Sequence, residues 1–347
     1  MNGRHAGASG RTGVQRSQIL GTGSCLPDNV VTNEDMTKLV TTSDEWIQQR
    51  SGVKERRYLR PGEGSPVSLG AEAVRRALDR AALTLDDIDL LIYSTQNPEY
   101  FSPPSACFLQ EKLGMDGGIP AFDVRNQCSG FLYGIEIADA YIRTGIYERV
   151  LLACCETHSP GLEYSDAGRH ITVLFGDGAG AIVLGPAPTD GNSEVVSTEV
   201  HADGRSARQL CVEAGGGASR PRLCVEDLAQ PRIFPYMNGA AVFKKAVSGM
   251  TAAVKSQLAK NGLAISDIDY YFPHQANRRI SEAVAKFIGM DPDRIDHSIE
   301  RYGNCSSASI PIALDEAARA GKVRKGDLLL FSSFAAGFTW GAALVRF

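Results

Sequence analysis

Several features that would place this sequence in a broad functional class are missing from it. No segment reaches the roughly 18 consecutive apolar residues that a membrane-spanning helix needs, so no membrane association is expected. Neither sign of charge dominates, since 36 Lys and Arg against 40 Asp and Glu give a net charge of −4 at pH 7. Without a basic surplus, nucleic-acid binding is not expected. No two cysteines have the CxxC spacing of a metal site, and no metal is predicted.

The N-terminus lacks the apolar stretch of a secretory signal. Residues 1–17 are rich in Gly, Arg and Ser, which predicts a disordered tail. Because no export signal is found, the eight cysteines are expected to remain reduced in the cytoplasm. Burial is the default explanation for each of them unless its surroundings favour reactivity.

What the sequence does contain is a pattern that occurs twice. Asp87-Ile88-Asp89 and Asp267-Ile268-Asp269 each precede an apolar run, and an amphipathic segment that ends in Gly-Met follows each run. A cysteine-containing turn comes next in both copies, with Cys128 in the first and Cys305 as its counterpart in the second. Apolar runs separated by segments of helical period are typical of a mostly parallel sheet with crossover helices. We therefore predict an α/β fold made of two duplicated halves.

The division between the halves is expected in the polar stretch 185–193, which is rich in Pro, Gly and Ser. The N-terminal half then covers residues 18–185 and the C-terminal half covers residues 186–347. The second half also contains an irregular segment at residues 213–235. This segment either covers a substrate entrance or is a tolerated surface insertion.

Cys128 is the candidate nucleophile. It lies between a predicted strand, residues 121–124, and an apolar helix that begins near Gly130. The positive end of a helix dipole and free backbone N–H groups would lower the pKa of the thiol there and could also hold an oxyanion. The alternative is a small buried thiol, an interpretation that suits Cys154 and Cys155 better. Cys305 lies at a similar turn, so this geometry alone does not choose between the two sulfurs.

Two further candidates come from the second half. His274 directly follows a predicted strand, residues 268–272, so it should project from the carboxyl end of the sheet, where active sites gather. Asn304 precedes another helix, and its amide can donate two hydrogen bonds. A lone histidine is usually structural, and Gly303-Asn304 by itself could be only a turn. The remaining histidines lack comparable settings: His5, His158, His170, His201 and His297.

Six motifs make the sequence resemble a known family over residues 18–347. They are Thr42-Ser43-Asp44-Glu45-Trp46, Cys128-Ser129-Gly130-Phe131, Phe175-Gly176-Asp177-Gly178-Ala179-Gly180, His274-Gln275-Ala276-Asn277, Gly303-Asn304 and Gly337-Phe338-Thr339-Trp340-Gly341. The sequence resembles the ketoacyl synthase III family, that is, 3-oxoacyl-acyl-carrier-protein synthase III, among the thiolase-fold condensing enzymes. The resemblance implies a layered α-β-α-β-α pseudo-dimer.

The resemblance also implies a reaction. Cys128 would accept an acyl group from acyl-coenzyme A, and His274 and Asn304 would then bind the thioester carbonyl of malonyl-acyl-carrier protein. Decarboxylation would give a carbanion that attacks the acyl group on Cys128 and yields a 3-oxoacyl-carrier protein. The second oxyanion would be bound by the backbone N–H groups of Cys128 and Ala336. No permanently bound cofactor is implied, since coenzyme A enters as a substrate thioester.

Three more positions match binding residues of the family. By resemblance, Trp46 and Arg50 would bind coenzyme A, and Arg279 would help dock the acidic carrier protein. Lys244 is a further candidate for this docking. Ala167 stands where priming enzymes commonly have an arginine for the nucleotide, which predicts weaker coenzyme A contacts. The family also implies a homodimer.

Other functions stay open. The protein could be an acyltransferase that delivers the acyl group on Cys128 to a hydroxyl or amine, or a quinolone- or pyrone-type condensing enzyme of secondary metabolism. A cysteine hydrolase that uses Cys128 and His274 is a third possibility, and a non-catalytic binding protein is a fourth. The acyl donor and its chain length are not determined by the sequence.

Overall fold

The computed structural model describes residues 15–115, 117–228 and 230–347. Of the expected disordered tail, residues 1–14 lie outside the described residues. Ser17, the expected last residue of that tail, is fully buried and begins the first strand. Among the described residues no helix is long and apolar enough to cross a bilayer. No cluster of three or more His, Cys, Asp or Glu side chains in these ranges is arranged to hold a metal ion.

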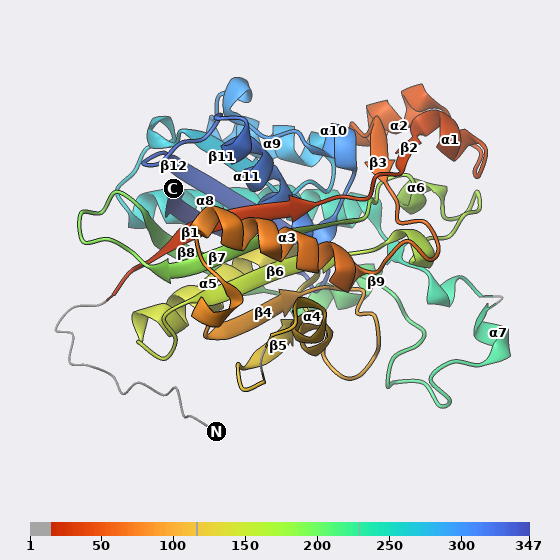
Figure 1. The fold of residues 1–347 in the computed structure, drawn as a ribbon. Coiled ribbons are helices and arrows are strands. Elements are labelled where there is room, and N and C mark those ends of the chain that lie inside the picture. Colours follow the sequence, from red (N-terminus) through yellow and green to blue (C-terminus); the bar gives the residue numbers. More distant parts are fainter. Residues whose placement is uncertain (1–14, 116, 229) are drawn as a thin grey trace.

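Two sheets run through the molecule (Figure 1). The first has the strand order β1-β7-β6-β4-β5, and the second has the order β11-β12-β13-β8. The strands of the first sheet are β1 Ser17–Cys25, β4 Leu90–Ser94, β5 Ala121–Val124, β6 Val150–Glu156 and β7 Gly178–Pro186. Those of the second are β8 Glu194–Ala202, β11 Tyr270–Pro273, β12 Leu328–Ala335 and β13 Thr339–Arg346. No strand of either sheet crosses the stretch 187–193.

The expectation of a mostly parallel arrangement was wrong. In these two sheets β4 pairs in parallel with β5 and β6, and β11 with β12, while β1–β7, β6–β7, β12–β13 and β13–β8 are antiparallel. The turn between β12 and β13 is three residues long, which is too short for a parallel crossover. Uniform apolar runs indicate burial on both faces, and they do not reveal strand direction.

Helices fill three layers around the two sheets. The outer helices α3 and α4 pack on the first sheet, α8 and α9 pack on the second, and α5 and α11 lie between the sheets. Strand β6 packs against helices on both of its faces. Leu151 lies in the hydrophobic core beneath the outer helices α3 and α4, and the next residue, Leu152, lies in the core between the two sheets. The predicted α-β-α-β-α arrangement is confirmed. These helices are α3 Pro66–Ala81, α4 Ser105–Leu113, α5 Gly130–Arg143, α8 Gly239–Lys260, α9 Arg278–Ile288 and α11 Ser309–Arg319.

Shorter strands and helices lie at one end of the two sheets (Figure 1). The short strands are β2 Val30–Thr32, β3 Glu55–Arg57, β9 Leu210–Cys211 and β10 Tyr236–Met237. The short helices are α1 Asn33–Thr37, α2 Asp44–Ser51, α6 Arg169–Thr172, α7 Val225–Leu228 and α10 Ile299–Tyr302. Two 3₁₀ turns, η2 Gln127–Ser129 and η8 Ser306–Ala308, precede the central helices α5 and α11.

The repeated aspartates have the same structural role in both halves. Asp89 donates its backbone N–H to the carbonyl of Arg149 and accepts the N–H of that residue on its carboxylate. Asp269 makes the same two bonds with Leu328. Each aspartate therefore aligns the first residues of two neighbouring parallel strands, which explains why the motif precedes an apolar run twice.

Candidate active site

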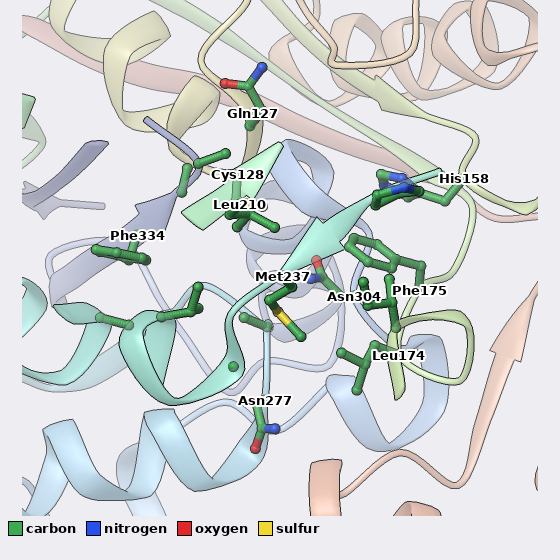
Figure 2. Close-up of a pocket in the computed structure, with 18 of the residues that line it drawn as sticks. Gln127, Cys128, His158, Leu174, Phe175, Leu210, Met237, Asn277, Asn304 and Phe334 are labelled. Carbon is green, nitrogen blue, oxygen red and sulfur yellow. The ribbon is translucent and has the colours of Figure 1, made fainter. Parts of the chain in front are cut away.

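A single large cavity brings most of the predicted site residues together. Its volume is about 1050 Å³. The lining includes seven of the eight predicted site residues: Cys128, His274, Asn304, Ala336, Trp46, Arg50 and Arg279. Lys244, the eighth, is exposed on α8 and does not line the cavity. Figure 2 shows Cys128 and Asn304 among the residues around this space.

Cys128 lies where it was expected, in η2 between β5 and α5. The preceding residue, Gln127, has a left-handed backbone with φ of 43°, a conformation that L-residues adopt only when the surroundings hold it. Gly130 lets the start of α5 approach Ser94 at the end of β4, since a Cβ at this position would collide with the hydroxyl of Ser94. The first turn of α5 is thereby drawn close to the end of β4.

The expected lowering of the Cys128 pKa was wrong for this structure. Burial raises the pKa of the thiol to about 12, because the surrounding protein disfavours the charged thiolate. The hydroxyl of Ser306, 3.4 Å from the sulfur, lowers the pKa in part. The thiol is partly accessible from the cavity, so an acyl donor can reach it in the protonated form.

Cys305 is not the structural counterpart of Cys128. Residues Gln127 and Ser306 both have a left-handed backbone and both begin the turn before a central helix, so Cys128 corresponds to Ser307. Cys305 precedes that turn, is fully buried, and contacts the carbonyl of Tyr302 through its sulfur. The sequence repeat was aligned on the wrong residue because both turns contain a cysteine.

His274 directly follows β11, at the carboxyl end predicted for it. Its backbone N–H donates to the carbonyl of Ser332 at 2.7 Å, which fixes its position against β12. Neither ring nitrogen has a hydrogen-bond partner among the described residues, although both are buried. Burial lowers the pKa of the imidazole to about 3, so the ring is neutral at physiological pH and has one N–H to offer a ligand.

Asn304 is held by its own backbone. Its N–H donates to the carbonyl of Leu174 at 2.8 Å, and its carbonyl accepts the N–H of Gly176 at 3.1 Å. The side-chain oxygen accepts the N–H of Ser306 at 2.8 Å. This bond orients the amide, and the NH₂ group is left as a donor on the cavity side.

The sequence did not single out His158, which also lines the cavity. It follows the end of β6 by two residues, much as His274 follows the end of β11 by one. Its ring packs on that of Phe175 with centroids 4.5 Å apart, and Figure 2 shows the two side chains together on one side of the cavity. Applying the strand-end argument to every histidine would have identified it.

Arginine side chains flank Trp46 near the cavity. The guanidinium of Arg50 lies 5.6 Å from the centroid of the indole ring, and that of Arg169 lies 5.3 Å from it. Arg169 comes two residues after Ala167, the position at which an arginine was missing from the family pattern. A cation near this indole is therefore supplied from a different position of the chain.

The irregular segment 213–235 contributes to the cavity wall. Ile233 and Pro235 line the cavity, together with Val212 and Met237 on either side of the segment. The sequence left two explanations for this segment, a cover over a substrate entrance or a tolerated surface insertion. The C-terminal end of the segment favours the first, because it supplies apolar surface to the cavity.

Comparison with known proteins shows which family the chain is similar to. Two family models match the chain: 3-oxoacyl-[acyl-carrier-protein (ACP)] synthase III at residues 122–204 and the C-terminal part of the same family at residues 258–347. The beta-ketoacyl-[acyl-carrier-protein] synthase III of Alkalilimnicola ehrlichii is 45% identical over 331 residues, which cover 95% of this chain and 99% of that protein. The enzyme of the same name from Thiobacillus denitrificans is 42% identical over 95% of this chain and 99% of its own.

Solved structures show the same relationship. The crystal structure of 3-oxoacyl-[acyl-carrier-protein] synthase III from Aquifex aeolicus superimposes with a TM-score of 0.86 at 37% identity, over 95% of this chain and all of that one. The priming beta-ketosynthase of the R1128 polyketide biosynthetic pathway gives a TM-score of 0.86 at 31% identity, over 96% of this chain and 98% of its own. The chain therefore belongs to the 3-oxoacyl-acyl-carrier-protein synthase III family of thiolase-fold condensing enzymes and is an acyltransferase.

Proposed function

We propose that this protein catalyses the decarboxylative Claisen condensation of an acyl group with malonyl-acyl-carrier protein. The acyl group comes from acyl-coenzyme A and is carried on Cys128. One observation carries the proposal: a thiol, a neutral imidazole and an amide donor line the same cavity. We also propose the division of the chain after residue 185, so that Cys128 comes from the first half and His274 and Asn304 come from the second.

The first step is transfer of the acyl group to the sulfur. The sulfur of Cys128 adds to the thioester carbonyl of acyl-coenzyme A, the C–S bond to coenzyme A breaks, and the thiol proton leaves with the departing sulfur. The enzyme is then an acyl thioester, and free coenzyme A departs. The backbone N–H groups of Cys128 and Ala336 are proposed to bind the oxyanion that forms later, when the carbon nucleophile adds to this acyl thioester.

The second step makes the carbon nucleophile. The thioester oxygen of malonyl-carrier protein accepts hydrogen bonds from His274 and from the Asn304 amide, and loss of carbon dioxide leaves an enolate on that oxygen. Neutral donors suit this step because they stabilise charge that develops only as the bond to the carboxylate breaks. The enolate carbon then attacks the acyl carbon on Cys128. The C–S bond breaks, the sulfur takes up a proton from water, and 3-oxoacyl-carrier protein is released.

Side chains in and beside the cavity are proposed to bind the two substrates. Trp46 and Arg50 are proposed to bind the nucleotide end of coenzyme A, with Arg169 as an additional contact to the indole. Arg279 and Lys244 are proposed to dock the acidic carrier protein. We further propose a cytoplasmic homodimer that holds no permanent cofactor, in keeping with a family whose substrates arrive as thioesters.

Two pathways fit the same chemistry. The similarity to beta-ketoacyl-[acyl-carrier-protein] synthases III supports initiation of fatty acid synthesis. The similarity to a priming beta-ketosynthase of a polyketide pathway supports a role in secondary metabolism, which includes the quinolone- and pyrone-type condensations. Both require acyl transfer to Cys128 followed by attack of a decarboxylated malonyl unit.

The experiment is intact mass spectrometry of the wild type and Cys128→Ala after incubation with acyl-coenzyme A thioesters of increasing length. An acyl adduct on the wild type alone, discharged by malonyl-carrier protein with release of carbon dioxide, is the expected result. Equal acylation of Cys128→Ala would contradict the assignment of the nucleophile. An adduct that malonyl-carrier protein leaves intact would favour an acyltransferase with a hydroxyl or amine acceptor, and release of free acid would favour a hydrolase.

A further inference from the structure

His158 is a buried histidine that the proposed mechanism does not use. Its side chain is 3% exposed, and its Nε2 atom has no hydrogen-bond partner among the described residues. The residue nevertheless lines the same cavity as Cys128, His274 and Asn304. A buried polar atom without a partner is uncommon because it costs free energy, and beside a substrate cavity it indicates that a ligand supplies the partner.

The tautomer of His158 is fixed by two neighbouring amides. The side-chain nitrogens of Gln96 and Asn97 lie 3.1 Å and 3.0 Å from Nδ1, and an amide nitrogen can only donate. The Asn97 nitrogen also donates to the carbonyl of Thr157 at 3.1 Å, which sets the orientation of that amide. Nδ1 is therefore an acceptor, and the single proton of the neutral ring is on Nε2.

The ring stays neutral throughout the physiological range. Burial and, to a smaller extent, the nearby His274 lower the pKa of His158 to about 3. The Nε2–H group is thus a permanent neutral donor on the cavity wall, and not an ionic one. A neutral donor can hold a carboxylate without the strong ion pair that would oppose its loss as carbon dioxide.

Gln96 connects this donor to the nucleophile. Its Nε2 group donates to His158, and its Oε1 atom lies 3.5 Å from the hydroxyl of Ser306, which in turn lies 3.4 Å from the Cys128 sulfur. On the other side, Phe175 packs on the His158 ring and pairs through its backbone with Asn304. His158 is therefore linked to the acyl-carrying residue through Gln96 and Ser306, and to one of the two proposed enolate donors through Phe175.

We propose that the Nε2–H group of His158 binds the free carboxylate of the malonyl group, next to the thioester oxygen held by His274 and Asn304. This inference rests on the proposed function. The two carboxyl carbons of a malonyl group are separated by one methylene, so donors for the two must be neighbours in one cavity. A hydrogen bond to the carboxylate would orient the C–C bond that breaks, which makes His158 a substrate-binding residue with specificity for acceptors that carry a second carboxyl group.

The test measures the two half-reactions separately in wild type, His158→Phe and His158→Gln. His158→Phe keeps a ring against Phe175 and removes the donor, whereas the amide of Gln can accept from Gln96 and donate toward the cavity. We expect His158→Phe to lower kcat/KM for malonyl-carrier protein roughly ten- to a hundredfold, with acylation of Cys128 unchanged and partial recovery in His158→Gln. His170→Phe is the matched control, since His170 lines the same cavity but is exposed. Equal losses in both half-reactions would indicate a packing role, and no loss would also overturn the proposal.

A binding measurement keeps the inference separate from the proposed function. The probes are two unreactive pantetheine amides, a malonamide and an isovaleramide of the same shape that lacks the carboxylate oxygens, titrated calorimetrically into the full-length enzyme. His158→Phe should weaken the malonamide about tenfold and leave the isovaleramide unchanged. Equal weakening of both amides, or of neither, would contradict the inference. If the wild type distinguishes the amides through His158 but catalyses no condensation, the proposed function fails and the carboxylate site remains.

Discussion

The hydroxyl of Ser306 lies 3.4 Å from the sulfur of Cys128, although 178 residues separate them in the sequence. Each residue belongs to the 3₁₀ turn that precedes a central helix, η8 in one half and η2 in the other. The nucleophile of the first half is therefore contacted by the equivalent turn of the second half. The duplicated fold brings the two turns together in the centre of the molecule, which explains why the site contains residues from both halves.

This contact predicts a change in thiol reactivity. The Ser306 hydroxyl lowers the pKa of Cys128 against the larger effect of burial, so Ser306→Ala should raise that pKa and slow alkylation by iodoacetamide at pH 8 about two- to tenfold. Peptide mass spectrometry gives the rate at Cys128. Exposed Cys107 is an internal standard in the same protein and should react equally in both variants. Faster alkylation of Cys128 in Ser306→Ala would contradict the role given to the hydroxyl.

A second prediction concerns His274. His274→Ala should retain acylation of Cys128 and lose malonyl decarboxylation by roughly 10²- to 10³-fold, as expected for removal of one oxyanion donor. Because burial lowers the pKa of this imidazole to about 3, the ring is neutral above that pH. The rate of carbon dioxide release should therefore show no titration of His274 between pH 5 and 8. A transition in this range that disappears in His274→Ala would show that the imidazole is charged there.

Glu156 gives a prediction about stability. Its carboxyl group is fully buried at the end of β6, where it accepts hydrogen bonds from Thr95 and Ser307, and burial raises its pKa from 4.5 to about 7. An acid whose pKa is raised on folding favours the folded state below the unfolded pKa, and that contribution is lost as the pH rises through the folded pKa. The wild type should lose on the order of 3 kcal/mol of this contribution between pH 4.5 and 7.

The comparison for Glu156 is with Glu156→Gln, which resembles the protonated acid in shape and hydrogen bonding. The free energy of unfolding, measured in urea at several pH values, should fall less steeply with pH in Glu156→Gln than in the wild type. Glu45→Gln, at an exposed position, is the matched control for the loss of one carboxylate. Parallel slopes for Glu156→Gln and the wild type would mean that Glu156 does not titrate in this window.

The duplicated α/β fold could be predicted from local patterns, whereas the layer order and most of the cavity residues came from the resemblance to a family. β5 has the predicted bounds, residues 121–124, and it lies between Pro120 and the polar residues Arg125 and Asn126. Cys128 and His274 were found because functional groups gather where strands end, and Asn304 was found because it precedes a helix in a motif of the family. Strand direction was not predictable, because buried strands are apolar whether they run parallel or antiparallel.

Other features depend on three-dimensional contacts that the sequence does not reveal. The match of Ser307 to Cys128 became visible only in the backbone angles of Gln127 and Ser306. The pKa of Cys128 is raised because the thiol is buried away from water, whereas the sequence indicated only that a helix begins near it. Arg169 reaches Trp46 from a position that the family pattern leaves unassigned.

The last prediction separates the two substrates at the rim of the cavity. Arg279 is exposed at the beginning of α9, and its guanidinium lies 5.8 Å from the ring centroid of Phe243. If it docks an acidic carrier protein, Arg279→Glu should raise KM for malonyl-carrier protein roughly tenfold at low ionic strength and leave acylation by acyl-coenzyme A unchanged. Trp46→Ala should have the opposite effect, because two guanidinium groups that suit a nucleotide phosphate lie within 5.6 Å of the centroid of the indole ring.

A matched control distinguishes the effect of the net charge of the enzyme from the effect of the position of Arg279. Lys286 is exposed in the last turn of the same helix and does not line the cavity, so Lys286→Glu makes a similar change in net charge at a distance. The effect of Arg279→Glu should shrink as salt rises, since the Debye length falls from about 30 Å at 0.01 M to about 10 Å at 0.1 M.

Lys244→Glu should give a smaller effect in the same direction, because Lys244 follows Phe243 on α8 but lies outside the cavity. Equal effects of Arg279→Glu and Lys286→Glu would mean that the carrier protein responds to the overall charge of the enzyme, and the docking site would then have to be sought elsewhere.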